Sequence, residues 1–412
     1  MNPFNERPRA EDTFFMDWKE LYPEPYDKNT TDPYTKTRII LMNGAEFEAN
    51  WFSHQFHRHC ADNELRRTLA VSRRAEKQQQ MHLACLKPLN ENLLETTISY
   101  EQLAVDLTAI LAQRETDPYV IATLNFALLE DFDHLYRYAD LMELEQGLKA
   151  EKLVGGYTEI MPGRPTISEH RHPLDCVGYH CDFTVAPLAT RLHTSIITAA
   201  EQQTMNFYMN IAGFYGSDRG RALYQEIGLI EEQHVSEYGS LLDPNATWLE
   251  NLLLHEYTEC FLYYSCYEDE TDPRIKKIWE RHFMQEVAHL HIAEKLLKDY
   301  EKKEASQVIP DGEFPELLRF SPQKDYVRTV LQNTVHNSAL REGFVPVSEL
   351  PEDADFFTYQ RRVNSNEESV PSHRVVADTI AEKTRDYRFE IAESPVPCLR
   401  DYKKDNTKLG RE

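Results

Sequence analysis

Two glutamates separated by thirty residues, with a histidine three residues after the second, occur twice in this chain. The first set consists of Glu201, Glu231 and His234, and the second of Glu256, Glu286 and His289. One constant interval along the chain relates each member of the first set to its counterpart in the second. Few folds place acidic and imidazole side chains at such regular intervals, so this spacing limits what the chain can form.

Each set is predicted to lie on one helical hairpin. Positions equally far from a turn lie at the same level in two antiparallel helices, and the midpoints of the intervals, residues 216 and 271, fall in predicted turns. Side chains at i and i+3 leave a helix on the same side, so each histidine can reach the same ion as its glutamate. Two such hairpins supply four carboxylates and two imidazoles, the ligand set of a dinuclear metal site in a four-helix bundle.

The candidate ligands interrupt apolar helix faces. Leu252, Glu256 and Cys260, for example, share one face, and the other three helices show the same arrangement. A carboxylate in an apolar stripe is unfavourable unless it is paired or binds a metal. The repeated pattern therefore favours a metal site over surface ion pairs.

Two further residues are candidate ligands. Glu259 follows Glu256 by three residues and could replace it or join it, although the spacing favours Glu256. His282 precedes Glu286 by one helical turn and either binds the metal directly or supports a ligand.

A third hairpin carries the same offsets in Glu101, Asp131 and His134. One constant interval separates Glu101, Asp131 and His134 from Glu256, Glu286 and His289, respectively. The turn sequence Glu-Thr-Asp-Pro also recurs, at 115–118 and 270–273. Either this hairpin takes part in the active bundle or it packs outside it. We favour the second arrangement, in which residues 188–241 face residues 247–300.

Across about residues 188–300, this doubled pattern resembles the ferritin-like superfamily of di-iron and di-manganese carboxylate proteins. The resemblance implies a four-helix bundle with two Fe ions, or alternatively Mn, and chemistry with O2 or peroxide. His282 together with Glu286 and His289 resembles the p-aminobenzoate N-oxygenase type of di-iron oxygenase. The superfamily includes storage proteins, peroxidases and oxygenases, so it does not fix the reaction.

The sequence thus predicts a non-haem di-iron or di-manganese oxidoreductase that uses O2 or peroxide with an unidentified small-molecule substrate or electron donor. The alternative is a ferritin-like metal-binding protein for iron storage, or for metal or oxygen sensing, without substrate turnover. A homodimer is one assembly that the sequence leaves open.

The expected fold is mainly α, with a ferritin-like bundle and added segments. Five regions are predicted: an irregular arm at 1–45, a helical layer at 46–148, an irregular insertion at 149–187, the bundle at 188–303 and an extended wrapping tail at 304–412. The insertion carries His and Cys between Glu169 and Cys181, but their spacing matches no zinc motif and favours a loop that covers the bundle.

Composition narrows the function further. The net charge of -24 argues against binding to nucleic acid or to an anionic membrane. Neither a signal peptide nor a long apolar stretch that could span a membrane is visible in the sequence. The seven cysteines are odd in number and include no Cys-x-x-Cys, which indicates a reduced, cytoplasmic protein.

Overall fold

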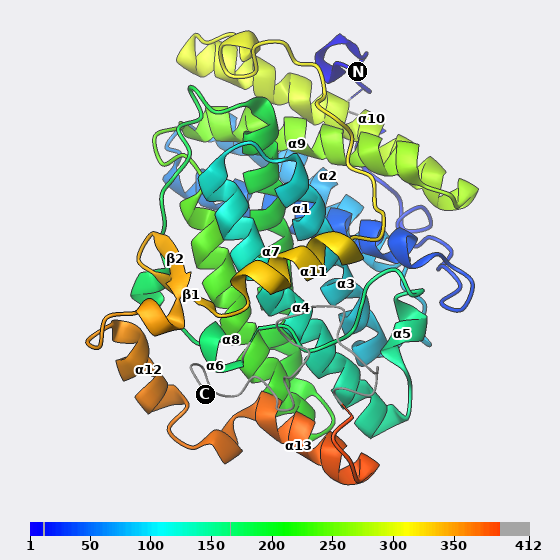
Figure 1. The fold of residues 1–412 in the computed structure, drawn as a ribbon. Coiled ribbons are helices and arrows are strands. Elements are labelled where there is room, and N and C mark those ends of the chain that lie inside the picture. The colour runs from blue at the N-terminus through cyan, green and yellow to red at the C-terminus, as the bar shows by residue number, and fades with distance from the viewer. Residues whose placement is uncertain (11–12, 165, 388–412) are drawn as a thin grey trace. The chain divides into compact units, whose positions relative to one another are not determined.

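Most of the described chain is helical, which confirms the mainly α class predicted from the sequence (Figure 1). The computed structural model describes residues 1–10, 13–164 and 166–387. Contacts divide the chain into two units. Unit 1 comprises Met1–Glu91, Cys181–Gln203 and Leu242–Phe320, and unit 2 comprises Asn92–His180, Thr204–Leu241 and Ser321–Glu412.

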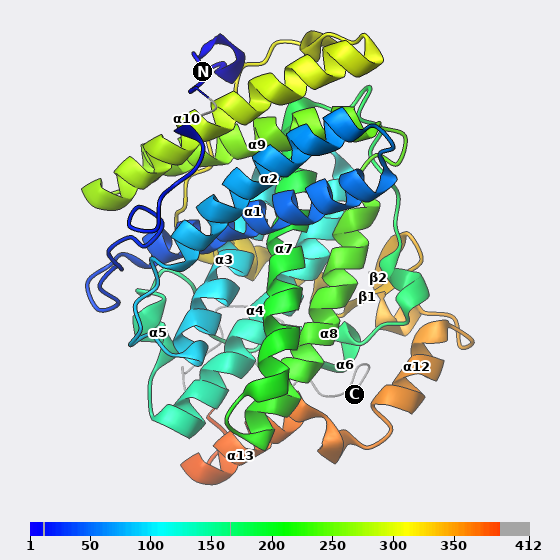
Figure 2. The same cartoon turned by 180° about the vertical axis from the view of Figure 1, so that it is seen from behind.

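Four helices of unit 1 contact one another in a ring. They are α1 (Pro33–His59), α2 (Asn63–Ala84), α9 (Trp248–Asp269) and α10 (Pro273–Leu296). α1 contacts α2 and α9, and α10 contacts the same two helices. Figure 2 shows α1 and α2 side by side in blue. Unit 1 also contains the N-terminal part of α7 (Leu188–Phe214) and the short elements η1 (Pro3–Asn5), η4 (Leu297–Glu301) and η5 (Ala305–Gln307).

Local sequence explains where these helices begin. The Asp32 side chain accepts a hydrogen bond from the backbone of Tyr34, and Pro33 occupies the first helical position of α1. Thr247 and Glu250 form a capping box at the start of α9. Such side chains satisfy backbone N–H groups that have no partner within the helix.

In unit 2, three helices and the C-terminal part of α7 also enclose a common interior. The helices are α3 (Leu93–Arg114), α4 (Pro118–Gln146) and α8 (Asp218–Ser240). α4 contacts both α3 and α8. On α7, Phe207 stacks on Tyr100 of α3 with ring centroids 4.3 Å apart, and Tyr208 packs against Tyr224 of α8 at 5.6 Å.

The C-terminal part of unit 2 packs on these helices. α13 (Pro371–Lys383) contacts α4 and α8, and α11 (Lys324–Thr334) contacts α4 through a shared apolar core. Strands β1 (Asn337–Leu340) and β2 (Gly343–Pro346) form an antiparallel hairpin. The remaining elements are α5 (Ala150–Leu153), α6 (Thr166–Glu169), η3 (Pro173–Cys176), η6 (Val347–Glu349), α12 (Asp355–Val363) and η7 (Glu367–Ser369).

The division into units does not follow the predicted pairing of residues 188–241 with residues 247–300. α8 belongs to unit 2, whereas α9 and α10 belong to unit 1 and pack on α1 and α2. The N-terminal hairpins are therefore not an outer layer. Each of the four hairpins buries carboxylates, so each needs the interior of a bundle around those groups.

The predicted regions change accordingly. α1 begins at Pro33, inside the expected arm 1–45. The expected layer 46–148 and the expected bundle 188–303 are each divided between the two units. Residues 149–187 contain only short helical turns among the described positions.

The expected extended tail at 304–412 contains three helices and the β-hairpin, while residues 388–412 lie outside the described part. Among the described ranges, no helix has the length and apolarity needed to cross a membrane.

Candidate metal centres

A cluster of buried acidic side chains lies inside unit 1. All four helices of the ring contribute to it. Its members are Glu46, Glu76, Glu256, Glu259, Glu286 and His289. Ligand atoms of Glu76, Glu256 and His289 lie within 4.8 Å of one another, and so do those of Glu256, Glu259 and Glu286.

A few hydrogen bonds orient this unit 1 cluster. The hydroxyl of Tyr263 donates to Oε1 of Glu46 at 2.5 Å, and the amide of Gln79 donates to Oε1 of Glu286. Nδ1 of His289 lies 3.0 Å from Oε2 of Glu286. One tyrosine, one glutamine and one histidine thus hold two of the five carboxylates.

Several atoms of the cluster lack a hydrogen-bond partner within the described residues. They are Oε2 of Glu46, Glu76 and Glu256, both carboxylate oxygens of Glu259, and Nε2 of His289. Buried polar atoms are almost always bonded, so a group of orphaned acceptors indicates a ligand site.

The protonation equilibria indicate the same shortage of positive charge. Burial raises the pKa of Glu46, Glu256 and Glu259 well above the usual range, and neighbouring carboxylates raise it further. Burial opposes the charged form of His289, but Glu286 and Glu256 outweigh it and raise the pKa of His289 to about 10. One imidazolium cannot balance five carboxylates.

Glu270 shows how unit 1 satisfies a buried carboxylate with a structural role. Arg38 donates to it from Nε at 3.1 Å and from Nη2 at 3.2 Å, and Trp279 donates from Nε1 at 3.0 Å. Burial raises the pKa of Glu270, but Arg38 outweighs burial, so the pKa lies below its usual value. Glu46 is bonded by a tyrosine instead, and Glu286 by a glutamine and by His289. Neither carboxylate bonds to an arginine or lysine among the described residues, which leaves room for a cation.

The two additional candidates lie in different surroundings. Glu259 is a member of the unit 1 cluster. His282 is fully buried, but its Nε2 lies 2.8 Å from Nδ1 of His82 and its Nδ1 lies 3.0 Å from Oε1 of Gln285. Both ring nitrogens of His282 are therefore bonded to neutral side chains, as in a supporting residue.

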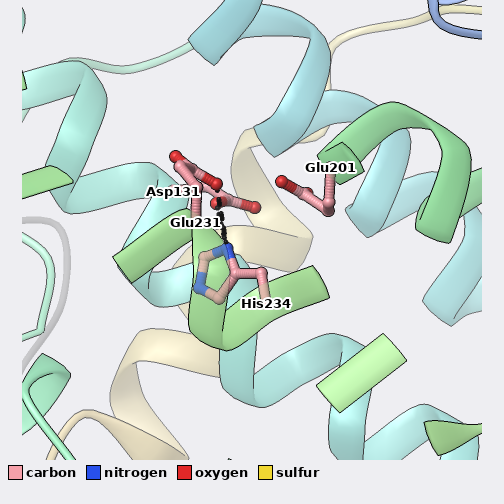
Figure 3. Close-up of side chains that lie close together, drawn as sticks. All are labelled: Asp131, Glu201, Glu231 and His234. Atoms are coloured by element: carbon pink, nitrogen blue, oxygen red, sulfur yellow. Dashed lines mark ion pairs between the residues drawn. The ribbon is translucent and has the colours of Figure 1, made fainter. Parts of the chain in front are cut away.

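A second cluster lies inside unit 2. In Figure 3, Asp131 of α4 and Glu231 of α8 point toward the ring of His234. Nδ1 of His234 lies 3.3 Å from Oδ1 of Asp131 and 3.2 Å from Oε2 of Glu231. Ligand atoms of Glu101, His134 and Glu231 also lie within 4.8 Å of one another.

Buried polar atoms recur in this unit 2 cluster. Both oxygens of Asp131, Oε2 of Glu231 and Nε2 of His134 make no hydrogen bond of good geometry among the described residues, and Nδ1 of His234 is close to both carboxylates. Burial raises the pKa of Asp131, although His234 opposes this shift. Burial would also raise the pKa of Glu231, but bonds from His134 and His234 lower it.

Glu130 and Arg171 orient the ring of His234. Its Nε2 lies 2.7 Å from Oε2 of Glu130, which Arg171 holds through Nη1 at 2.9 and 3.0 Å. With the ring proton on Nε2, the lone pair of Nδ1 points toward Asp131 and Glu231 and is available to a metal. Histidines that bind metals commonly donate their other ring N–H to a carboxylate in this way.

The two clusters have equivalent hydrogen bonds. Tyr208 donates to Oε1 of Glu101 at 2.6 Å in unit 2, as Tyr263 donates to Glu46 in unit 1. The interval from Glu46 to Glu101 equals the interval from Tyr208 to Tyr263. The same tyrosine–glutamate bond is therefore made by equivalent positions.

A second bond repeats in the same way. His134 contacts Oε1 of Glu231 at 3.1 Å, where Gln79 donates to Oε1 of Glu286. The interval from Gln79 to His134 again equals the interval from Glu231 to Glu286, with a glutamine in the place of a histidine. Equivalent positions of the two clusters therefore make equivalent hydrogen bonds.

The six ligands predicted from the sequence do not form one site. Glu256, Glu286 and His289 meet in unit 1, and Glu231 and His234 meet in unit 2. Glu201 is buried on the part of α7 that falls in unit 1 and is drawn in Figure 3. The interval from Glu201 to Glu256 is the same as the interval between the other members of the two predicted sets. The role of Glu201 as a ligand is a prediction from this spacing.

Sequence reasoning missed the first hairpin of unit 1. Glu76 follows Glu46 by thirty residues, and Gln79 follows Glu76 by three. The signal was the same spacing that marked the other hairpins. It was overlooked because a glutamine stands where the other three hairpins have a histidine.

The insertion contributes structural bonds. Arg171 joins Glu130 to Glu237, and His170 lies 2.9 Å from Oε1 of Glu226. Among the described residues, no histidine or cysteine between 169 and 181 belongs to a group that could hold a metal.

No protein-family model, curated protein or solved structure matches this chain.

Proposed function

We propose that each unit is a ferritin-like bundle that holds a dinuclear metal centre, and that the protein is a non-haem di-iron or di-manganese oxidoreductase acting with O2 or peroxide. One observation carries this proposal. In each unit, buried carboxylates from several helices converge with oxygens that accept no hydrogen bond from the described residues.

The donor sets fit hard or intermediate divalent ions. Carboxylate oxygen and imidazole nitrogen suit iron and manganese, and two divalent ions would offset most of the negative charge in either cluster. The unit 1 centre would use Glu46, Glu76, Glu256, Glu259, Glu286 and His289. The unit 2 centre would use Glu101, Asp131, His134, Glu231 and His234.

When bound, such ions would supply electron transfer to O2 or peroxide. The surrounding residues prepare the site for this chemistry. Tyr263 and Tyr208 fix the orientation of Glu46 and Glu101, and burial of the clusters excludes bulk water. Glu130 fixes the ring of His234.

Metal analysis of the purified protein tests the proposal. The double variants Glu286→Ala/His289→Ala and Glu231→Ala/His234→Ala should each lose about half of the bound iron or manganese. Glu64→Ala, on the exposed face of α2, serves as a control and should bind as much metal as the wild type. Double variants that are folded and still bind the wild-type amount would refute the assignment.

Storage or sensing would use the same centres without turnover. Consumption of O2 or peroxide separates the two functions. An oxidoreductase consumes many equivalents per chain when a reductant is present, whereas a storage or sensing protein stops after a stoichiometric reaction.

A further inference from the structure

A cavity of about 430 Å³ lies within unit 1 and reaches its carboxylate cluster. Residues of α1, of α9 and of the N-terminal part of α7 line it. Glu259 belongs both to the cavity wall and to the metal-ligand group with Glu256 and Glu286. A molecule in this cavity would therefore meet a side chain of the proposed centre.

The walls of the cavity are mainly apolar and aromatic. Trp51, Phe52, Trp248, Leu254 and Leu262 are among the lining residues. The rings of Phe52 and Trp248 are 5.6 Å apart. The volume falls in the usual range for sites that bind small organic molecules.

The lining contains three acidic side chains, those of Glu48, Asp243 and Glu259, and two histidines, His59 and His255. No lysine or arginine occurs among the described residues that line the cavity. Asp243 is occupied by the backbone N–H groups of Phe183 and Asn245, at 2.9 and 2.8 Å. Oε2 of Glu48 is shielded from solvent and accepts no hydrogen bond from the described residues.

We propose that this cavity binds a primary amine with an apolar, aromatic body, and that Glu48 receives its ammonium group. The ammonium group would supply the hydrogen-bond donor that Glu48 lacks. Aromatic rings such as those of Trp51, Phe52 and Trp248 attract cations through their π faces. An anion would lie beside three acidic side chains and would meet no lysine or arginine among the described lining residues, so a carboxylate ligand is disfavoured.

Regarding this amine as the substrate rests on the proposed function, whereas its binding does not. The p-aminobenzoate N-oxygenase type named above acts on a molecule that carries a carboxylate. That molecule also carries an amine, but the described lining offers no lysine or arginine to bind its carboxylate.

Calorimetric titration with three probes of one shape tests the charge preference. They are 3-phenylpropylamine, 3-phenylpropan-1-ol and 3-phenylpropionate. The amine should bind about tenfold more tightly than the alcohol, since a bond to a charged group adds that much affinity. The propionate should bind most weakly. Equal affinity for amine and alcohol, or a preference for the propionate, would overturn the proposal.

Three variants locate the binding site. Glu48→Gln keeps the shape of the side chain and should remove the preference for the amine while affinity for the alcohol stays unchanged. Trp51→Ala should weaken the amine and the alcohol alike. Glu64→Gln removes an exposed carboxylate on α2, outside the cavity lining, and should leave all three affinities unchanged. If Glu48→Gln keeps the full amine preference, the assignment of Glu48 is wrong.

Repeating the titration with chelator-treated protein and with Glu286→Ala/His289→Ala separates this inference from the metal proposal. Amine binding without metal supports the cavity assignment even if no metal centre exists. Metal binding with no amine preference rejects the cavity assignment and leaves the metal centres standing.

Discussion

Individual buried carboxylates in this protein fall into two kinds. Glu270 and Glu130 each bond to an arginine. Burial raises the pKa of each, but the arginine and the other donors around it together hold the pKa below its usual value. Burial raises the pKa of Glu256 and Glu259, and neighbouring carboxylates add to this shift. We expect the first kind to stabilise the fold and the second kind to bind a cation.

Replacing Arg38 with methionine tests the first kind. The change leaves Glu270 buried without its partner, which should lower the free energy of unfolding by roughly 3 kcal/mol at neutral pH. Burial raises the pKa of folded Glu270 but Arg38 lowers it more, so the stability from this pair is present above the ordinary value of 4.5 and is lost as the pH falls through the folded pKa.

Urea unfolding of both proteins across this range measures the effect. The difference between wild type and Arg38→Met should shrink as the medium becomes more acidic. A constant difference would show that Arg38 acts through packing alone.

Gln79 offers a test of the second kind. It occupies the position where the other three hairpins have His134, His234 and His289. Gln79→His should add an imidazole to the unit 1 centre and tighten metal binding by on the order of tenfold. Competition against a chelator measures this affinity, with Gln78→His on the same helix as the matched control.

Sequence reasoning at this scale identified which residue types would be buried. It selected Glu231, His234, Glu256, Glu286 and His289 from their spacing, with the apolar helix faces as support, and all five are buried. It assigned these five to one site because spacing specifies the level of a side chain along its helix and not the helix that it faces.

At the scale of elements, one turn is repeated with its bonds intact. Oε1 of Glu115 accepts hydrogen bonds from the backbone of Thr116 and Asp117, and Oε1 of Glu270 does the same for the two residues that follow it. Asp117 and Asp272 then cap α4 and α10. This Glu-Thr-Asp-Pro turn was predictable because its chemistry is local.

Asp117→Ala and Asp272→Ala should each cost about 1 kcal/mol of stability through the loss of a helix cap. The effects should appear in different units, because α4 belongs to unit 2 and α10 to unit 1. Amide hydrogen exchange measures this, with faster exchange expected in the first turns of the helix that loses its cap. Equal changes in both helices for either variant would contradict the separation.

At the scale of the whole molecule, the partner of each hairpin could not be predicted. All four hairpins carry the same spacing and similar apolar faces, so any two would satisfy the pattern. The first and fourth hairpins belong to unit 1, and the second belongs to unit 2 with α8 and the C-terminal part of α7. Each unit thus contains helices from both halves of the longer repeat, the one that relates Glu101 to Glu256.

Metal removal should destabilise the two units independently. Ligand binding at a thousand times Kd stabilises a protein by about 4 kcal/mol, so a chelator should lower the melting temperature by several degrees. In Glu231→Ala/His234→Ala, the chelator should change hydrogen exchange only in unit 1. A chelator response in α3, α4 and α8 of that variant would contradict two separate centres.

The interleaving of the two units has a consequence for protein synthesis. The hairpin of α1 and α2 leaves the ribosome before its partner hairpin, which begins only after positions 92–241 have been made. At ordinary elongation rates this delay lasts roughly 8 to 30 s. Throughout it, the acidic and apolar face of α1 and α2 is open to chaperones and to the same hairpins of a neighbouring nascent chain, which is how exchange of elements between copies begins.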